Sequence, residues 1–264
     1  ITVIQRYFVG WRVLVMHETK IQSRDAILQA IAPMPLAQSG GTELINSLAA
    51  EAKILHLKKR SPIATFGDRA QRFFLIRSGW VKLFRETLDG TEAIIDILTT
   101  DHFFGETALF ENNLYPFSAE ATEPVTLLSL PLAPVAAELE HNSKFALAMI
   151  QTMARYRRHQ DMELEHRTIQ TAPQRIGCFL LRLADQSKDG DVTVQLPYDK
   201  VLVASRLGMK PETFSRALGK LKADTGIKVD GATIHVTNLG ILSSYACTAC
   251  SGEYPCGDKI HPFL

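Results

Sequence analysis

The chain has 264 residues, of which 46% are hydrophobic and 22% are charged, with 29 Lys and Arg against 28 Asp and Glu. This apolar fraction supports a packed core, which excludes intrinsic disorder, collagen and coiled-coil rods. A net charge of +1, taken over the whole chain, argues against nucleic-acid binding, because such proteins usually carry a basic surplus. Four cysteines in so long a chain do not make a disulfide scaffold, so a cytoplasmic location with reduced thiols is expected.

Residues 1–15 form a mostly apolar opening that contains two arginines. It resembles either a poor signal peptide or sequence upstream of a start at Met16. No run of 18 uninterrupted apolar residues follows, so no membrane span is expected. A helix is predicted from Arg24 to Ile31, and then a loop marked by two prolines and two glycines as far as Gly41. Residues 1–40 are therefore assigned to an N-terminal extension.

Short apolar runs broken by turn dipeptides predict an antiparallel β-roll over residues 41–134. The breaks include Ser78-Gly79 and Asp89-Gly90, which are typical of hairpin turns. The predicted strands include Phe73 to Ile76, Val81 to Phe84, Ala93 to Leu98 and Val125 to Leu130.

A long helix is predicted over residues 135–172, because this stretch has no Gly or Pro and is rich in helix-favouring residues. Steps of three and four along it give a row with apolar ends and a charged centre. Such a row is typical of a homodimer seam, in which Asp161 repels its symmetry mate unless Arg157 or solvent offsets the charge. The alternative is an ordinary solvated helix face. The row is Leu147, Ile150, Ala154, Arg157, Asp161 and Leu164.

Residues 173–246 fit a winged helix-turn-helix. Short helices are predicted at 199–207 and 211–222, separated by Gly208-Met209-Lys210, and two strands follow around Asp230-Gly231. A helix at 174–184 and a strand at 192–196 precede them. Residues 174–246 hold ten Lys and Arg against seven Asp and Glu, whereas residues 41–134 hold nine against twelve. The near-neutral total therefore conceals a basic module and an acidic one.

The order of these parts and the segment Phe104-Gly105-Glu106-Thr107-Ala108-Leu109-Phe110 resemble the CRP/FNR family of bacterial transcription regulators. The resemblance implies an α+β fold with an N-terminal β-roll, a long dimerisation helix and a C-terminal winged helix-turn-helix. It also implies a homodimer that binds double-stranded DNA and works with RNA polymerase. An enzyme is not expected, since no nucleophile elbow, phosphate loop, zinc-protease helix or Rossmann fingerprint occurs.

One departure from the family pattern concerns the ligand. In members that bind cyclic nucleotide, an Arg-Ser pair follows the roll motif, and its guanidinium forks onto the phosphate. Here the matching stretch is Tyr115-Pro116-Phe117-Ser118, with no Arg or Lys between Arg85 and Lys144. Burying a phosphate without a cation is costly, so no cyclic-nucleotide binding is predicted, and Glu106 is expected to be structural.

The second short helix carries the candidate base-reading residues. Glu212 and Arg216 lie four apart on one helical face with Ser215 beside them, a width that fits the major groove. This arrangement resembles the FNR type, which implies a TTGAT half-site in an inverted repeat. The alternative is a Glu–Arg pair on a solvated helix. Thr213 and Lys220 are candidate phosphate contacts.

Other residues of this module have simpler assignments. Arg206 is expected either near DNA or as a solvated surface residue. The core-facing side of the second short helix is predicted to be Phe214, Ala217, Leu218 and Leu221.

The C-terminal tail, residues 247–264, holds three thiols, Cys247, Cys250 and Cys256. Thiolates bind soft metals, so an iron–sulfur cluster or zinc is expected, with one position left for another group. The pattern resembles FNR regulators of the Bacillus type, which carry such a cluster at the C-terminus and complete it with a non-cysteine ligand. That resemblance implies a [4Fe-4S] redox or gas sensor, with Asp161 or Glu163 as the candidate fourth ligand.

Three alternatives remain for the signal. The tail carries idle thiols, or it holds a structural zinc, or the β-roll binds haem as in nitric-oxide regulators of the DNR type, which share the Pro-Glu-Thr-Phe-Ser-Arg helix. His56 and His102 lie in the roll segment, but each is by default a surface or satisfied residue. Cys178 lies on an apolar helix and is predicted to be part of the core.

Overall fold

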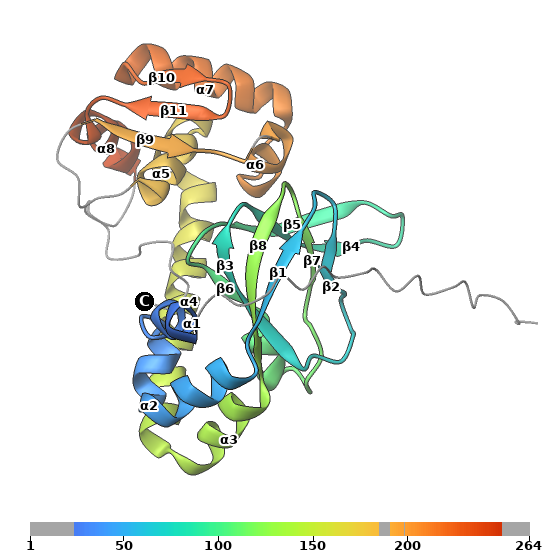
Figure 1. Cartoon of the computed structure of the whole chain (residues 1–264). Helices are drawn as coiled ribbons and strands as arrows, with labels where there is room; N and C mark the ends of the chain where they lie inside the picture. Colours follow the sequence, from blue (N-terminus) through green and yellow to red (C-terminus); the bar gives the residue numbers. More distant parts are fainter. Residues whose placement is uncertain (1–23, 185–190, 198, 250–264) are drawn as a thin grey trace, which may run out of the picture.

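The computed structural model describes residues 24–184, 191–197 and 199–249 (Figure 1). The N-terminal part begins with α1 (Arg24–Ile31), as predicted, and continues with α2 (Pro35–Ala50). The loop predicted over this second stretch is wrong, because Pro35 stands at a helix start, where its missing N–H costs nothing. Gly41, at φ 75°, is non-helical and divides this stretch into two helical parts across a kink.

Eight strands form the β-roll as two four-stranded antiparallel sheets, ordered β1-β8-β3-β6 and β2-β7-β4-β5. The register of β3 against β8 places Phe73 opposite Leu130, and both are fully buried. The rings of Phe74 and Phe104 stack at 5.3 Å between β3 and β6. The predicted antiparallel roll is therefore confirmed. The strands are β1 (Lys53–Leu57), β2 (Pro62–Ala64), β3 (Arg72–Ser78), β4 (Val81–Glu86), β5 (Glu92–Leu98), β6 (Phe103–Phe104), β7 (Ser118–Ala121) and β8 (Val125–Pro131).

Two helices, not one, follow the roll: α3 (Ala133–His141) and α4 (Ser143–Ile169). Asn142 separates them in an extended conformation, and its side-chain oxygen accepts hydrogen bonds from the backbone N–H groups of Lys144 and Phe145. Such a cap satisfies amides that have no partner within the helix. The long helix predicted from residue 135 therefore starts eight residues later. None of the helices in the described ranges is long and apolar enough to cross a membrane.

The C-terminal part is a winged helix-turn-helix, as predicted, at the opposite end of the molecule from α1 and α2 (Figure 1). A capping box between Thr171 and Gln174 starts its first helix. The sheet order is β10-β11-β9. The elements are α5 (Ala172–Leu183), β9 (Val192–Gln195), α6 (Lys200–Arg206), α7 (Pro211–Thr225), β10 (Lys228–Asp230), β11 (Thr233–Val236), α8 (Leu239–Ala246) and the 3-10 turn η2 (Cys247–Ala249).

Helices α5 and α8 approach closely at Gly177. A Cβ added there would lie 3.1 Å from the Cβ of Ala246 and 3.4 Å from a methyl of Leu242. Because both distances are shorter than or at the limit of ordinary contact, this crossing has no room for a larger side chain.

Candidate DNA-reading helix and sensor sites

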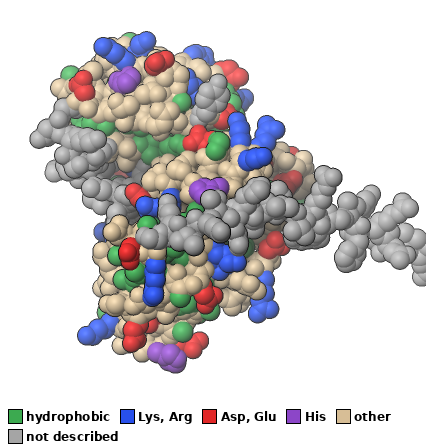
Figure 2. Space-filling view, in the orientation of Figure 1, with side chains coloured by type: hydrophobic (Ala, Val, Ile, Leu, Met, Phe, Trp, Pro, Cys, Tyr) green, Lys and Arg blue, Asp and Glu red, His purple; other side chains and the backbone are tan. Residues whose placement is uncertain are grey.

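Helix α7 has one buried face and one exposed face. The buried face holds Phe214, Ala217, Leu218 and Leu221, which confirms the predicted core-facing side. Glu212, Ser215 and Arg216 are exposed on the rest of the helix. In Figure 2, Lys and Arg side chains, mixed with carboxylates, gather along the edge formed by the C-terminal part. The helix therefore presents the three side chains to solvent on a rigid support.

The two candidate phosphate contacts differ in availability. Thr213 is half-buried, whereas Lys220 is exposed and its Nζ lies 3.0 Å from the carboxylate of Asp224. The hydrogen bond from Lys220, followed by one from Tyr245, lowers the pKa of Asp224. A phosphate approaching Lys220 would therefore compete with an existing carboxylate partner.

Glu106 lies inside the β-roll at the start of the 3-10 turn η1 (Glu106–Phe110). Gly105 precedes it at φ 98°, where an added Cβ would lie 3.3 Å from the Tyr115 ring and 3.4 Å from the Phe73 Cα. Only glycine suits this left-handed position against the neighbouring strand. Glu106 is 2% exposed, and burial raises its pKa to about 8.

Among the described residues, the Glu106 carboxyl lacks a hydrogen bond at one oxygen, while a bond with its own backbone N–H partly opposes the effect of burial on its pKa. Its Oε2 has no hydrogen-bond partner in the part of the chain that the structure describes. With its raised pKa, the side chain is predominantly a neutral acid at pH 7. The expected structural role of Glu106 stays a prediction.

The pKa of Glu106 predicts a pH effect on stability. Between its ordinary pKa of 4.5 and about 8, the folded state keeps a proton that the unfolded state loses. The free energy of unfolding therefore falls as pH rises through this window. Glu106→Gln should remove this dependence, so the melting temperature should change less between pH 5.5 and pH 8.5 than in the parent protein. Glu111→Gln, at an exposed position of the same segment, is the control; equal pH slopes in all three proteins would contradict the prediction.

The segment that replaces the family's Arg-Ser pair is held by hydrogen bonds. The Tyr115 hydroxyl donates to the carbonyl of Arg72 at 2.7 Å. Arg85 Nε donates to the carbonyl of Pro116 at 2.9 Å, and its guanidinium lies over the Phe66 ring. A cation from β4 therefore lies beside a segment that has none within its own sequence. Because no Arg or Lys occurs between Arg85 and Lys144, the sequence alone did not predict a cation beside this segment.

Arg206 is the main residue that sequence reasoning placed wrongly. It is 8% exposed, because its guanidinium lies between the β-roll and the C-terminal part. Nε donates to Asp96 Oδ1 at 2.8 Å, and Nη2 donates to Glu163 Oε1 at 2.6 Å. Arg182 Nη1 also donates to Glu163, at 3.0 Å. We call Asp96, Glu163, Arg182 and Arg206 the junction cluster.

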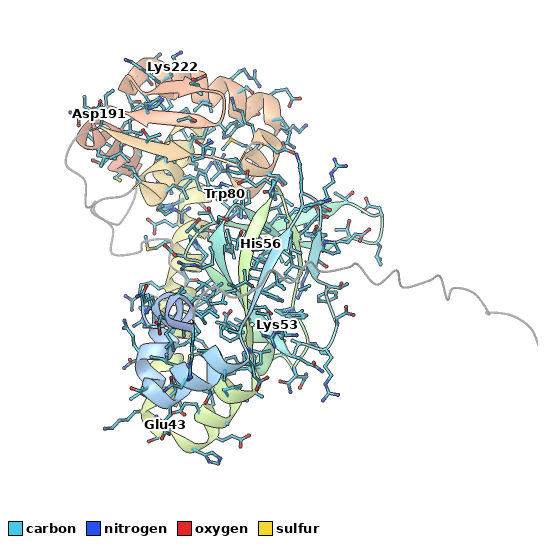
Figure 3. The ribbon with its side chains drawn as sticks, in the orientation of Figure 1. Glu43, Lys53, His56, Trp80, Asp191 and Lys222 are labelled. Carbon is cyan, nitrogen blue, oxygen red and sulfur yellow. The ribbon has the colours of Figure 1, made fainter. Side chains whose placement is uncertain are left out.

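The junction cluster joins strand β5 to α4, α5 and α6. Burial lowers the pKa of Arg206, but Asp96 and Glu163 outweigh it, so the net pKa is raised. Tyr156 on α4 lies close enough for Asp96, Arg206 and Glu106 to influence its pKa, which burial raises most. Trp80, in the turn before β4, lies at the end of the roll nearest to the C-terminal part (Figure 3). Strand β5 of the roll and α6 of the helix-turn-helix are therefore joined by an ion pair.

The predicted dimer row lies on one exposed face of α4. Leu147, Ile150 and Leu164 are 57%, 62% and 61% exposed, which is unusual for large apolar side chains. Arg157 Nε lies 3.0 Å from Asp161 Oδ1, so the charged centre of the row is offset within one helix. Ala154, which lies between Ile150 and Arg157 in the row, is also exposed.

The described part of the cysteine tail is short. Cys247 is half-buried at the start of η2, whereas Cys250 and Cys256 lie outside the described residues. Within the described ranges, no group of three His, Cys, Asp or Glu side chains is placed to hold a metal ion. The candidate fourth ligands, Asp161 and Glu163, are both bound to arginines.

The two histidines of the roll, His56 and His102, and the core cysteine each lie close to a polar atom. His56 lies on β1 (Figure 3), where its Nδ1 is 3.1 Å from the Thr126 hydroxyl. His102 Nδ1 lies 3.0 Å from the carbonyl of Thr99. Cys178 is buried in the C-terminal core, as predicted, and its Sγ lies 3.9 Å from His166 Nδ1.

Comparisons with known proteins agree with this arrangement. Residues 54–142 match the cyclic nucleotide-binding domain family, and residues 174–245 match the Crp-like helix-turn-helix domain family. A crystal structure of a putative cyclic nucleotide binding protein from Ruegeria pomeroyi is 31% identical, with a TM-score of 0.67 over 85% of this chain and 99% of that one. The chain belongs to the CRP/FNR family of transcription regulators.

Curated regulators also align with most of this CRP/FNR chain. The cyclic AMP receptor protein of Thermus thermophilus is 28% identical over 78% of this chain and 97% of its own length. The global nitrogen regulator of Nostoc is also 28% identical, over 67% of this chain and 82% of its own length. This chain therefore combines a domain of the cyclic nucleotide-binding family with a Crp-like helix-turn-helix domain.

Proposed function

We propose that this CRP/FNR regulator reads a TTGAT inverted repeat through Glu212, Ser215 and Arg216, acts as a homodimer and works with RNA polymerase. The observation that supports base reading is the exposure of these three side chains on α7, whose opposite face is buried. Fluorescence anisotropy with a labelled TTGAT inverted repeat and a scrambled duplex tests it. Preferential, salt-dependent binding to the repeat is expected.

The exposed apolar row on α4 supports the proposed dimer. Ile150→Asp should place like charges face to face at the seam and dissociate the dimer. Light scattering after size exclusion should show a fall from twice the chain mass to the chain mass of 29.3 kDa. Gln151→Asp, at the next exposed position and off the row, should leave the dimer intact. An Ile150→Asp protein that remains dimeric at micromolar concentration would contradict this interface.

We propose that a redox or gas signal acts through an iron–sulfur cluster on Cys247, Cys250 and Cys256. Three thiolates in ten residues provide suitable ligands for such a cluster. The position of Cys247 supports a link to DNA binding, because its neighbours are tied to the connection between α4 and α5. Gln174 Nε2 donates to the Thr248 hydroxyl at 3.0 Å, and Gln170 Nε2 lies 3.5 Å from the carbonyl of Ala246.

Anaerobic purification followed by iron, sulfide and zinc analysis tests the cofactor. Iron and sulfide, with broad visible absorption, are expected in the parent protein and should be lost in Cys247→Ser. Cys178→Ser is the matched control, since this thiol lies in the core and should not affect iron content. Zinc without sulfide would instead indicate a structural tail, and a sharp Soret band would indicate haem; either result contradicts the cluster.

A further inference from the structure

A hollow of about 310 Å3 lies between α1 and the sheet that contains β1, β8 and β3, and we call it the α1 hollow. Leu55 of β1 is paired with Leu127 of β8, and both are buried in the core. Successive residues of a strand point to opposite faces, and the hollow is lined by the residues that alternate with these leucines. The hollow therefore lies on the other face of the sheet, beside α1 (Figure 1).

One side of the α1 hollow is apolar. Ala26, Ile27 and Ala30 line it from α1, and Ile54 and Leu128 line it from directly paired positions of β1 and β8. A volume of 310 Å3 equals the share of about ten water molecules in the liquid and lies at the lower limit of small-molecule sites. This side therefore suits the apolar body of a small molecule.

The other side of the hollow is polar and carries positive charge. His56, Thr126 and Ser78 form one row across β1, β8 and β3, because Thr126 is paired with both of the others. A register shift between Ile76 and Ser78 makes Arg77 an extra residue of β3. Such a bulge re-aims side chains, so Arg77 and Ser78 both line the hollow although they are adjacent in sequence. None of the described residues that line the hollow is Asp or Glu.

The Arg77 guanidinium can exchange its present partner for a ligand. Its Nη1 lies 3.3 Å from Asp101 Oδ1, and the two side chains are 42% and 63% exposed. Ion pairs this open to solvent contribute little, so a second carboxylate can replace Asp101. His56 Nδ1 lies 3.1 Å from the Thr126 hydroxyl, and the other ring nitrogen offers a further hydrogen bond. The polar side therefore suits an anionic head group.

We infer that the α1 hollow binds a small monocarboxylic acid with an apolar body, the chemistry of a medium-chain fatty acid. The planar guanidinium of Arg77 matches a carboxylate in a bidentate pair. The apolar body contacts α1 and the Ile54–Leu128 pair, which removes apolar surface from water. A neutral molecule would not pair with Arg77, and a short acid would leave the apolar side in contact with water. Binding here is a property separate from base reading and from the cysteine tail.

Isothermal titration and thermal unfolding of the full chain test the site. Sodium octanoate is the probe, because its size of about ten non-hydrogen atoms matches the hollow. Octan-1-ol has the same body without the charge, and sodium acetate has the same head without the body. At one pH and one sodium concentration, octanoate should bind saturably and raise the melting temperature. Octan-1-ol and acetate should each bind about tenfold more weakly or less.

Three variants locate the two ends of the ligand. Arg77→Gln should weaken octanoate binding by about tenfold or more, because a charge-assisted pair is lost. Asp101→Asn should strengthen octanoate binding, because the competing carboxylate is removed. Ala26→Phe should fill the apolar side and prevent binding. Arg69→Gln is the matched control, since Arg69 is exposed on the roll and does not line the hollow.

Circular dichroism and the melting temperature without ligand show whether each variant folds as the parent does. Equal binding of octanoate and octan-1-ol would overturn recognition of the carboxylate. An unchanged octanoate affinity in either Arg77→Gln or Asp101→Asn would overturn the role of Arg77, so the test does not depend on one variant. An unchanged affinity in Ala26→Phe would overturn the location in the α1 hollow.

Discussion

Glu212→Ala is expected to abolish discrimination at one base pair in each TTGAT half-site while leaving non-specific DNA binding nearly unchanged. A carboxylate in the major groove accepts a hydrogen bond from a cytosine amine, and such contacts contribute about 1–3 kcal/mol of discrimination. Because a dimer presents two copies of α7, the effect occurs at both half-sites. Competition anisotropy with single-base variants of the repeat measures the loss.

Lys220→Ala provides the comparison for Glu212→Ala. Loss of a phosphate contact should weaken binding to all duplexes by a similar factor and reduce the salt dependence. Its effect should be small, because Lys220 already has Asp224 as a partner. If the Glu212→Ala protein still discriminates between the base variants as the parent does, the base-reading assignment is wrong.

Arg206→Met is expected to lower the free energy of unfolding by about 3 kcal/mol, near the lower end for breaking a buried ion pair. The change leaves the Asp96 and Glu163 carboxylates at the interface without their shared partner. Their side chains are 25% and 17% exposed, so water screens them only partly. Urea unfolding, monitored by tryptophan fluorescence and circular dichroism, measures the difference in the free energy of unfolding between the Arg206→Met and parent proteins.

A double variant separates lost charge pairing from lost packing. Adding Asp96→Asn to Arg206→Met should recover part of the stability, because one unpaired carboxylate is removed. Arg157→Met is the matched control; its pair with Asp161 is exposed and should contribute less than about 1 kcal/mol. A similar loss in the Arg157→Met and Arg206→Met proteins would contradict a special role for the junction cluster.

Local sequence signals were sufficient for much of the fold. Turn dipeptides such as Ser78-Gly79 locate the strands because they require backbone conformations that few residue pairs adopt. Pro211, after a glycine-containing turn, locates the start of α7 because the fixed φ of proline suits the first helical position. The exposed row on α4 and the buried face of α7 follow from helical periodicity.

Other features depended on contacts that the sequence does not contain. Asn142 is a favoured cap residue, but only its two hydrogen bonds show that it divides α3 from α4. Arg206 and Asp96 are 110 positions apart, so no periodicity or spacing relates them. The same holds for Arg85 beside Pro116, since the cation comes from a neighbouring strand.

The close crossing of α5 and α8 at Gly177 has a mechanical consequence. Because no side chain separates the two backbones there, we expect these helices to move together, and Cys247 lies directly after the last residue of α8. We therefore expect that local side-chain rearrangement does not absorb a structural change at the cysteine tail. We expect such a change to appear as a rotation of the whole DNA-binding domain about Gln170 and Thr171, which alters the spacing between the two recognition helices of a dimer.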